Sequence, residues 1–113
     1  MHTLDEKQAA FSRLLTIMDE LREQCPWDRK QTFESLRHLT IEETYELADA
    51  ILDADLDEVK KETGDLMLHM VFYAKIASEQ GAWDIADSLL TCVYPNFWGG
   101  LICFMDALRT KIP

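Results

Sequence analysis

Apolar residues recur every three or four positions along most of this 113-residue chain. This spacing is typical of helices that bury one face against a core. It predicts a first helix over Leu4 to Gln24, which ends before Pro26 because proline disfavours helical geometry at the residue before it. The apolar face of that helix is formed by Leu4, Phe11, Leu14, Leu15, Met18 and Leu21.

The next segment predicts a helical hairpin. Thr32 is a good N-cap for a short helix over Phe33 to Leu36, and Thr40 either restarts that helix or continues it to about Asp53. The break over residues 53–56 is short, so we expect the following helix to fold back antiparallel and to run to about Gln80. Asp55 caps this helix and Gly81 follows its end.

Each helix of the expected hairpin carries an apolar stripe. We expect the two stripes to form the hairpin interface, with the neighbouring carboxylates at its rim. Gly64, inside the second helix, indicates either a close approach to the backbone or plain helix packing. The stripes consist of Ile41, Tyr45, Ala48 and Leu52 in the first helix, and of Val59, Leu66, Met70 and Ala77 in the second.

The end of the chain differs in character. Asp84 is expected to cap a further helix through Ile85, Leu89 and Leu90. Residues 94–100 have the composition of a turn-rich loop, and residues 101–108 are almost wholly apolar. We therefore expect residues 91–113 to bury themselves or to pair with another subunit.

Four carboxylates are spaced so that they can converge. Glu43 and Glu46 are three residues apart, as are Glu62 and Asp65, so each pair lies on one face of its helix. Two such pairs facing each other repel unless protons or cations lie between them, and carboxylate oxygens suit Mg²⁺ or Mn²⁺. The alternative is a solvated acidic face, in which Thr40 and Glu43 form a capping box.

Other candidate residues have both a functional and a plain structural interpretation. Trp27 either closes the end of a helix bundle or stacks on a nucleotide base, and Arg29 and Lys30 either contact phosphate or are simply solvated. His69 lies four residues after Asp65 and either orients that carboxylate or is hydrogen-bonded within a helix interface. Glu-x-x-His is absent from the sequence, which disfavours a di-iron carboxylate bundle.

Composition narrows the class of protein. The net charge of −10 argues against binding to DNA or RNA, which requires a basic patch. The three cysteines have no Cys-x-x-Cys spacing, which favours free thiols in a reducing cytoplasm. The polar N-terminal residues lack the apolar segment of a signal peptide, and no apolar run has transmembrane length. We expect a cytoplasmic protein without membrane contact.

Several motifs together resemble the MazG nucleotide pyrophosphohydrolases, an all-α family. They are Cys-Pro-Trp-Asp at 25–28, the segment 31–36, the segment 40–46 with Glu-Glu-x-x-Glu at 42–46, and the segment 61–66 with Glu-x-x-Asp at 62–65. The resemblance implies one domain over residues 1–113, with residues 1–90 similar to the family and 91–113 a divergent apolar tail. It also implies helical hairpins that form a four-helix-bundle-like homodimer or a higher oligomer, such as a homotetramer.

The activity implied by the resemblance is Mg²⁺-dependent hydrolysis of a nucleoside triphosphate to the monophosphate and pyrophosphate. In that family, acids at the positions of Glu43, Glu46, Glu62 and Asp65 ligate metal. Glu42 is the remaining acid of the motif. It is expected to bind a further ion or to position the water, and Glu42 or Glu43 is the candidate general base.

One segment departs from the family. Relatives usually follow the fourth helix with a basic stretch, whereas residues 89–97 here contain neither Lys nor Arg. Two alternatives to an active enzyme therefore remain. One is a module that binds metal or nucleotide without turnover, and the other is a helical oligomerisation domain.

Overall fold

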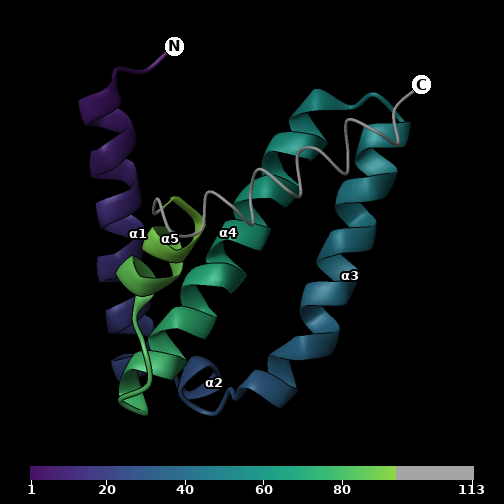
Figure 1. The fold of residues 1–113 in the computed structure, drawn as a ribbon. Coiled ribbons are helices and arrows are strands. Elements are labelled where there is room, and N and C mark those ends of the chain that lie inside the picture. Colours follow the sequence, from purple (N-terminus) through teal and green to yellow (C-terminus); the bar gives the residue numbers. More distant parts are fainter. Residues whose placement is uncertain (94–113) are drawn as a thin grey trace.

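The computed structural model describes residues 1–93, all of whose regular structure is helical. Five helices follow one another: α1 (Leu4–Gln24), α2 (Pro26–Arg29), α3 (Phe33–Leu52), α4 (Leu56–Glu79) and α5 (Ile85–Val93). In Figure 1, α4 runs diagonally through the molecule, with α1 and α3 on either side of it. None of the helices within residues 1–93 is long and apolar enough to cross a membrane.

Most helix boundaries agree with the sequence. Thr32 caps α3 by accepting a hydrogen bond from the Ser35 backbone N–H at 3.1 Å, and Asp55 caps α4 through the Glu58 N–H at 3.2 Å. Residues 26–29 form a separate helical turn after the break at Pro26. Thr40 continues the helix that begins at Phe33, as one alternative had it, so the alternatives of a restart at Thr40 and of a capping box between Thr40 and Glu43 are wrong.

The hydrophobic core lies along the C-terminal half of α4. Val71, Phe72 and Ile76 of α4 pack there with Met18 of α1 and Leu36 of α3, and each is at most 3% exposed. The core forms where three helices meet, and each contributes the apolar positions that recur at helical spacing.

Arg22 links α2 to the C-terminal end of α4 through hydrogen bonds and an ion pair. Its guanidinium donates to the backbone carbonyls of Asp28 at 2.7 Å and Gln31 at 3.1 Å, and it forms a two-pronged ion pair with Glu79. It also lies over the Phe72 ring, 5.7 Å from the centroid. An arginine suits this position because its planar group offers five N–H donors in a fixed geometry.

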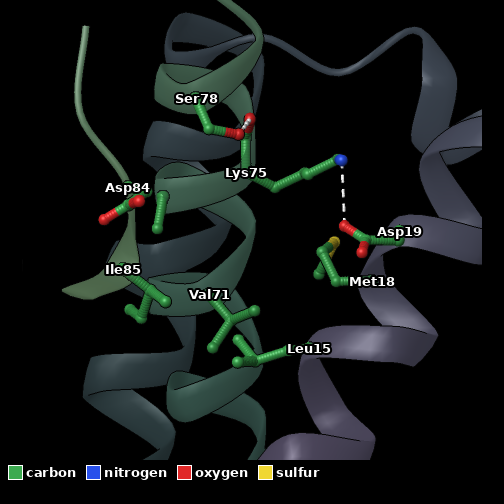
Figure 2. Close-up of a pocket in the computed structure, with 9 residues that line it drawn as sticks. Leu15, Met18, Asp19, Val71, Lys75, Ser78, Asp84 and Ile85 are labelled. Atoms are coloured by element: carbon green, nitrogen blue, oxygen red, sulfur yellow. Dashed lines mark hydrogen bonds and ion pairs between the residues drawn. The ribbon is translucent and has the colours of Figure 1, made fainter. Parts of the chain in front are cut away.

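A small apolar cleft lies between α1, α4 and the start of α5 (Figure 2). Its volume is about 190 Å³, and Leu15, Val71 and Ile85 are among the residues that line it. At its edge, Lys75 pairs with Asp19 at 2.9 Å, so this ion pair links α4 to α1.

The apolar stripe of α3 does not form the hairpin interface, contrary to expectation, whereas in the α4 stripe Val59 and Leu66 are half-buried and Ala77 is buried. Ile41, Tyr45 and Leu52 are 42%, 69% and 83% exposed, and Met70 of α4 is 44% exposed. The hairpin instead buries the neighbouring face of α3, which carries Glu43. Apolar spacing identifies a face that favours burial, but it does not say which partner covers it.

Gly64 has open space around it. A Cβ atom at this position would meet nothing within 4 Å, so the close approach expected at its backbone is absent within residues 1–93.

The turn between α3 and α4 contains a strained residue. Ala54 has φ of +55°, in the left-handed region where a Cβ atom costs roughly 1–2 kcal/mol.

We expect Ala54→Gly to raise the free energy of unfolding by about 1 kcal/mol, because the relief of strain exceeds the extra backbone entropy that glycine loses on folding. Ala10→Gly, on the exposed side of α1, is the control and should lower it by about 1 kcal/mol. Urea denaturation measures both, and a loss of stability in Ala54→Gly would contradict this account.

Candidate metal centre

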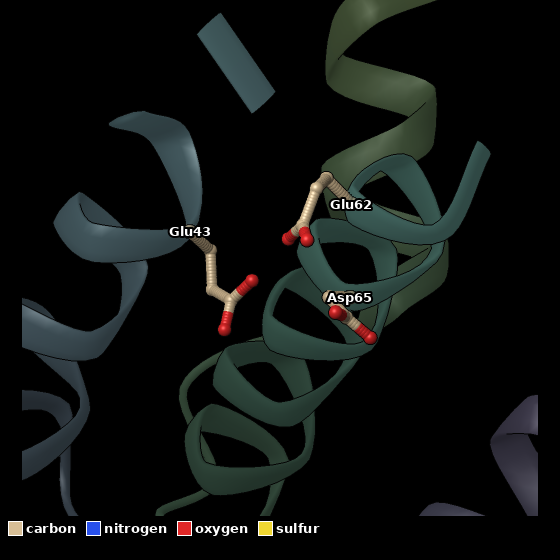
Figure 3. A group of neighbouring side chains, drawn as sticks. All are labelled: Glu43, Glu62 and Asp65. Carbon is tan, nitrogen blue, oxygen red and sulfur yellow. The ribbon is translucent and has the colours of Figure 1, made fainter. Parts of the chain in front are cut away.

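Three carboxylates from two helices meet in the α3–α4 hairpin. Glu43 extends from α3 toward α4, where Glu62 and Asp65 lie one turn apart (Figure 3). One oxygen from each of the three lies within 4.8 Å of the others. The i, i+3 spacing on α4 places Glu62 and Asp65 on one face, and the short turn at residues 53–55 brings α3 back against that face.

Two carboxylate oxygens at this centre are buried without a hydrogen-bond partner. They are Oε2 of Glu62, a residue that is only 3% exposed, and Oε2 of Glu43. A buried charged oxygen with no partner is costly and requires compensation. A hard divalent cation such as Mg²⁺ takes carboxylate oxygens as ligands, so the donor set and its unpaired atoms fit such an ion.

The proximity of the carboxylates changes their proton affinities. The pKa of Glu43 rises to about 7, chiefly because its protonated form can share a hydrogen bond with Glu62, and further because of burial and the charges of Glu46 and Asp65. The same contact with Glu43 lowers the pKa of Glu62. Without a metal ion, the pair therefore retains one proton up to near neutral pH.

The other two acids of the first motif lie outside this three-carboxylate cluster, although Glu46 is close enough to Glu62 to lower its pKa. Glu46 is exposed and lines an open cleft of about 370 Å³ beside it, which also reaches Glu62. Glu42 is exposed and lies about 100° around the α3 axis from Glu43. The structure thus brings together three of the four expected metal ligands and leaves Glu46 one turn away.

The residues expected to bind nucleotide lie at the other end of α3. Trp27 is 54% exposed, so it does not close the end of the bundle within the described chain, and Arg29 and Lys30 are exposed. These residues precede α3, whose first residue is ten positions before Glu43, which corresponds to about 15 Å along the helix axis. In a single chain, the expected nucleotide-binding residues and the carboxylates therefore form two separate sites.

His69 contacts α3 one helical turn below the carboxylates. Its Nδ1 lies 2.9 Å from the Thr40 hydroxyl, which also donates to the Leu36 carbonyl at 3.2 Å and contacts the Tyr73 hydroxyl. Burial lowers the pKa of His69, opposed by the charge of Asp65. This polar contact fixes α3 against α4 next to Glu43 and Asp65, and it matches the expectation of a histidine bonded within a helix interface.

Lys61 begins the motif segment at 61–66, but no role in the site was expected for it from the sequence. Its ammonium lies 3.2 Å from Oε1 of Glu62 and 3.9 Å from Oε2 of Glu58. The sequence signal was only its position next to Glu62, which does not by itself indicate contact, because adjacent helical residues point in different directions.

Comparison with known proteins identifies the domain. Residues 31–94, more than half of the chain, match the model of the MazG nucleotide pyrophosphohydrolase domain. This chain belongs to the MazG family. The match includes α3 and α4, and therefore all three carboxylates of the cluster.

Relatives that match the chain are substantially longer than it. A nucleoside triphosphate pyrophosphohydrolase of Escherichia coli K12 is 50% identical over 80 residues, which are 68% of this chain and 30% of that protein. The nucleoside triphosphate pyrophosphohydrolase/pyrophosphatase MazG of Thermotoga maritima is 48% identical over 90 residues, 78% of this chain and 35% of that protein. The matched region thus spans about a third of these relatives.

The raised pKa of Glu43 predicts a specific dependence of stability on pH. Between its ordinary pKa of 4.5 and about 7, the folded MazG domain holds a proton that the unfolded chain has lost. The free energy of unfolding of the metal-free protein should therefore fall as pH rises through this window. The lowered pKa of Glu62 has its effect below pH 4.5. There the stability that ionised Glu62 contributes to the fold is lost as pH falls.

Thermal unfolding in EDTA between pH 5 and 8 measures this effect, with Glu43→Gln as the matched variant. The difference in melting temperature, variant minus wild type, should grow with pH, and saturating Mg²⁺ should reduce it at pH 8 because the ion replaces the proton in the wild type. A difference that does not change with pH would contradict the shared proton.

Proposed function

We propose that this MazG domain hydrolyses a nucleoside triphosphate to the monophosphate and pyrophosphate in the presence of Mg²⁺, with Mn²⁺ as a substitute. The observation that carries the proposal is the buried carboxylate of Glu62, whose Oε2 has no hydrogen-bond partner and which offers one oxygen within 4.8 Å of an oxygen of Glu43 and of Asp65. Membership of the MazG family supports the choice of substrate and reaction.

In this proposal the chain's acids divide into two roles. Glu43, Glu62 and Asp65 would hold the ion, with Glu46 supplying a further oxygen from the cleft. When bound, the ion neutralises phosphate charge and makes a bound water more acidic. Glu42 is outside the cluster, so it remains free to accept a proton from the attacking water. Because Glu43 binds protons near neutral pH, it is the alternative base.

Recognition of the nucleoside is assigned to exposed residues of α2 and its C-cap. Trp27 offers an accessible aromatic face for a base, and Arg29 and Lys30 offer cations for phosphate. His69 is proposed to support Asp65 indirectly, through its contact with Thr40.

A second candidate is a module that binds metal or nucleotide without turnover. It is favoured by the absence of Lys and Arg from residues 89–97, where the MazG relatives are expected to be basic. Residues 94–97 of this segment, and the apolar tail up to 113, lie outside the described structure.

Pyrophosphate release from a panel of ribo- and deoxyribonucleoside triphosphates tests the proposed function. We expect release that requires Mg²⁺ and falls at least about 100-fold in Glu62→Gln, because the substitution removes a buried ligand. Glu34→Gln, an exposed acid in the first turn of α3, is the control and should retain activity. Absence of release from every triphosphate, with Mg²⁺ still binding by calorimetry, would favour the second candidate. Release that survives both EDTA and Glu62→Gln would contradict the proposed metal centre.

We infer that two copies of the chain associate through the exposed apolar stripe of α3 and the exposed Leu56 at the start of α4. Tyr45 and Leu52 of α3 and Leu56 of α4 are 69%, 83% and 80% exposed, which is a large apolar surface for a single chain to leave in water. A homodimer formed in this way would be a bundle of four helices, and a homotetramer would pair two such dimers.

Light scattering at micromolar concentration tests this association. Wild type should have at least the mass of a dimer, and Tyr45→Glu should shift the population toward monomer, because it places a charge in the apolar contact. Thr44→Glu introduces the same charge at the neighbouring exposed position, off the stripe, and should leave the mass unchanged. A wild-type monomer at this concentration would rule out the association.

A further inference from the structure

Lys61 is the single cation among the described residues that line the cleft beside the carboxylate cluster. Six of the other lining residues are acids: Glu46, Asp49, Asp53, Asp55, Glu58 and Glu62. The ammonium of Lys61 lies at 3.2 Å from Oε1 of Glu62, the most deeply buried of these acids. A positive charge in such surroundings reduces the electrostatic repulsion among the acids of the cleft.

The contact between Lys61 and Glu62 is asymmetric. The Glu62 side chain is 4% exposed, whereas that of Lys61 is 62% exposed. The lysine therefore reaches a buried carboxylate from solvent, on a long flexible stem that loses rotamer freedom in the contact. An ion pair with one exposed partner is weak, so a stronger cation can displace it.

Lys61 contacts two acids. Its ammonium lies 3.2 Å from Oε1 of Glu62 and 3.9 Å from Oε2 of Glu58. Lys60, the preceding residue, is different: within residues 1–93 it pairs with Asp57 alone, at 3.6 Å, its side chain is 80% exposed, and it does not line the cleft. The two lysines therefore carry the same charge, but only Lys61 lines the cleft and contacts Glu62.

We propose that Lys61 is an internal counter-ion of the metal centre that becomes a phosphate ligand when the metal binds. Without a divalent ion, it neutralises Glu62. When the ion takes the carboxylates, the ammonium is released and turns to the phosphate oxygens of the triphosphate. The identity of the ligand as a triphosphate rests on the proposed function. In this role Lys61 would give the site a cation, whereas the basic segment expected in the family is missing from the sequence.

Calorimetric titration with Mg²⁺ alone tests the first half of the proposal. We expect Lys61→Ala to bind Mg²⁺ about two- to fivefold more tightly than wild type, because the ion no longer competes with the ammonium. Lys60→Ala removes the same charge from outside the cleft and should leave the affinity within error of wild type. Both substitutions retain strong helix formers, and circular dichroism checks the fold. Unchanged or weaker Mg²⁺ binding by Lys61→Ala would overturn the counter-ion role.

Binding of inorganic triphosphate at saturating Mg²⁺ tests the second half. We expect Lys61→Ala to lose about tenfold or more in affinity, because it loses a charge-assisted hydrogen bond, while Lys61→Arg and Lys60→Ala bind as wild type does. Equal affinity of Lys61→Ala and wild type would overturn the phosphate role. These titrations need no turnover, so they decide the role of Lys61 even if the protein releases no pyrophosphate.

Discussion

The α3–α4 hairpin depends on how the buried charge of Glu62 is compensated. Its carboxylate lies between two helices, beside Glu43 and Asp65, with one oxygen that has no hydrogen-bond partner. In a poorly hydrated interface, such a group is stable only beside a proton or a cation. The chain itself supplies both, as a proton retained by Glu43 and as the ammonium of Lys61. A divalent ion would replace both, so its binding is coupled to proton release and to the position of one side chain.

The two halves of α4 serve different purposes. The C-terminal half carries Val71, Phe72 and Ile76, which pack in the core with α1 and α3. The N-terminal half carries Glu62 and Asp65, and among the described helices it packs against α3, with the Thr40–His69 contact between the two regions. Because the apolar core does not include the carboxylates, the repulsion among them strains the open end of the hairpin more than the core. An ion that binds only the folded hairpin would stabilise that end by mass action.

The sequence predicted the helices and the carboxylate pairs well, because both follow from local spacing. Residues three or four apart share a helix face whatever surrounds them, so the pairing of Glu62 with Asp65 could be predicted. The rotation of α3 about its axis could not, because it depends on packing between helices. This explains why the stripe that contains Tyr45 was expected in the interface but is exposed, and why Glu46 lies outside the closest cluster. The contact between Lys61 and Glu62 was missed for a related reason, since it depends on the path of a flexible side chain rather than on helical position.

The electrostatics of the whole chain favour a particular order of binding under the proposed function. The net charge of −10 repels a free triphosphate, and the only cleft-lining cation in the described residues already contacts a carboxylate. Such repulsion between exposed charges extends about 10 Å at ordinary salt concentrations. A triphosphate that carries its own divalent ion approaches with less negative charge and brings to Glu43, Glu62 and Asp65 the cation that they lack. The acidic surface therefore selects against metal-free phosphate, and at the carboxylate cluster the positive charge needed for binding comes from the ion and from the ammonium that the ion releases.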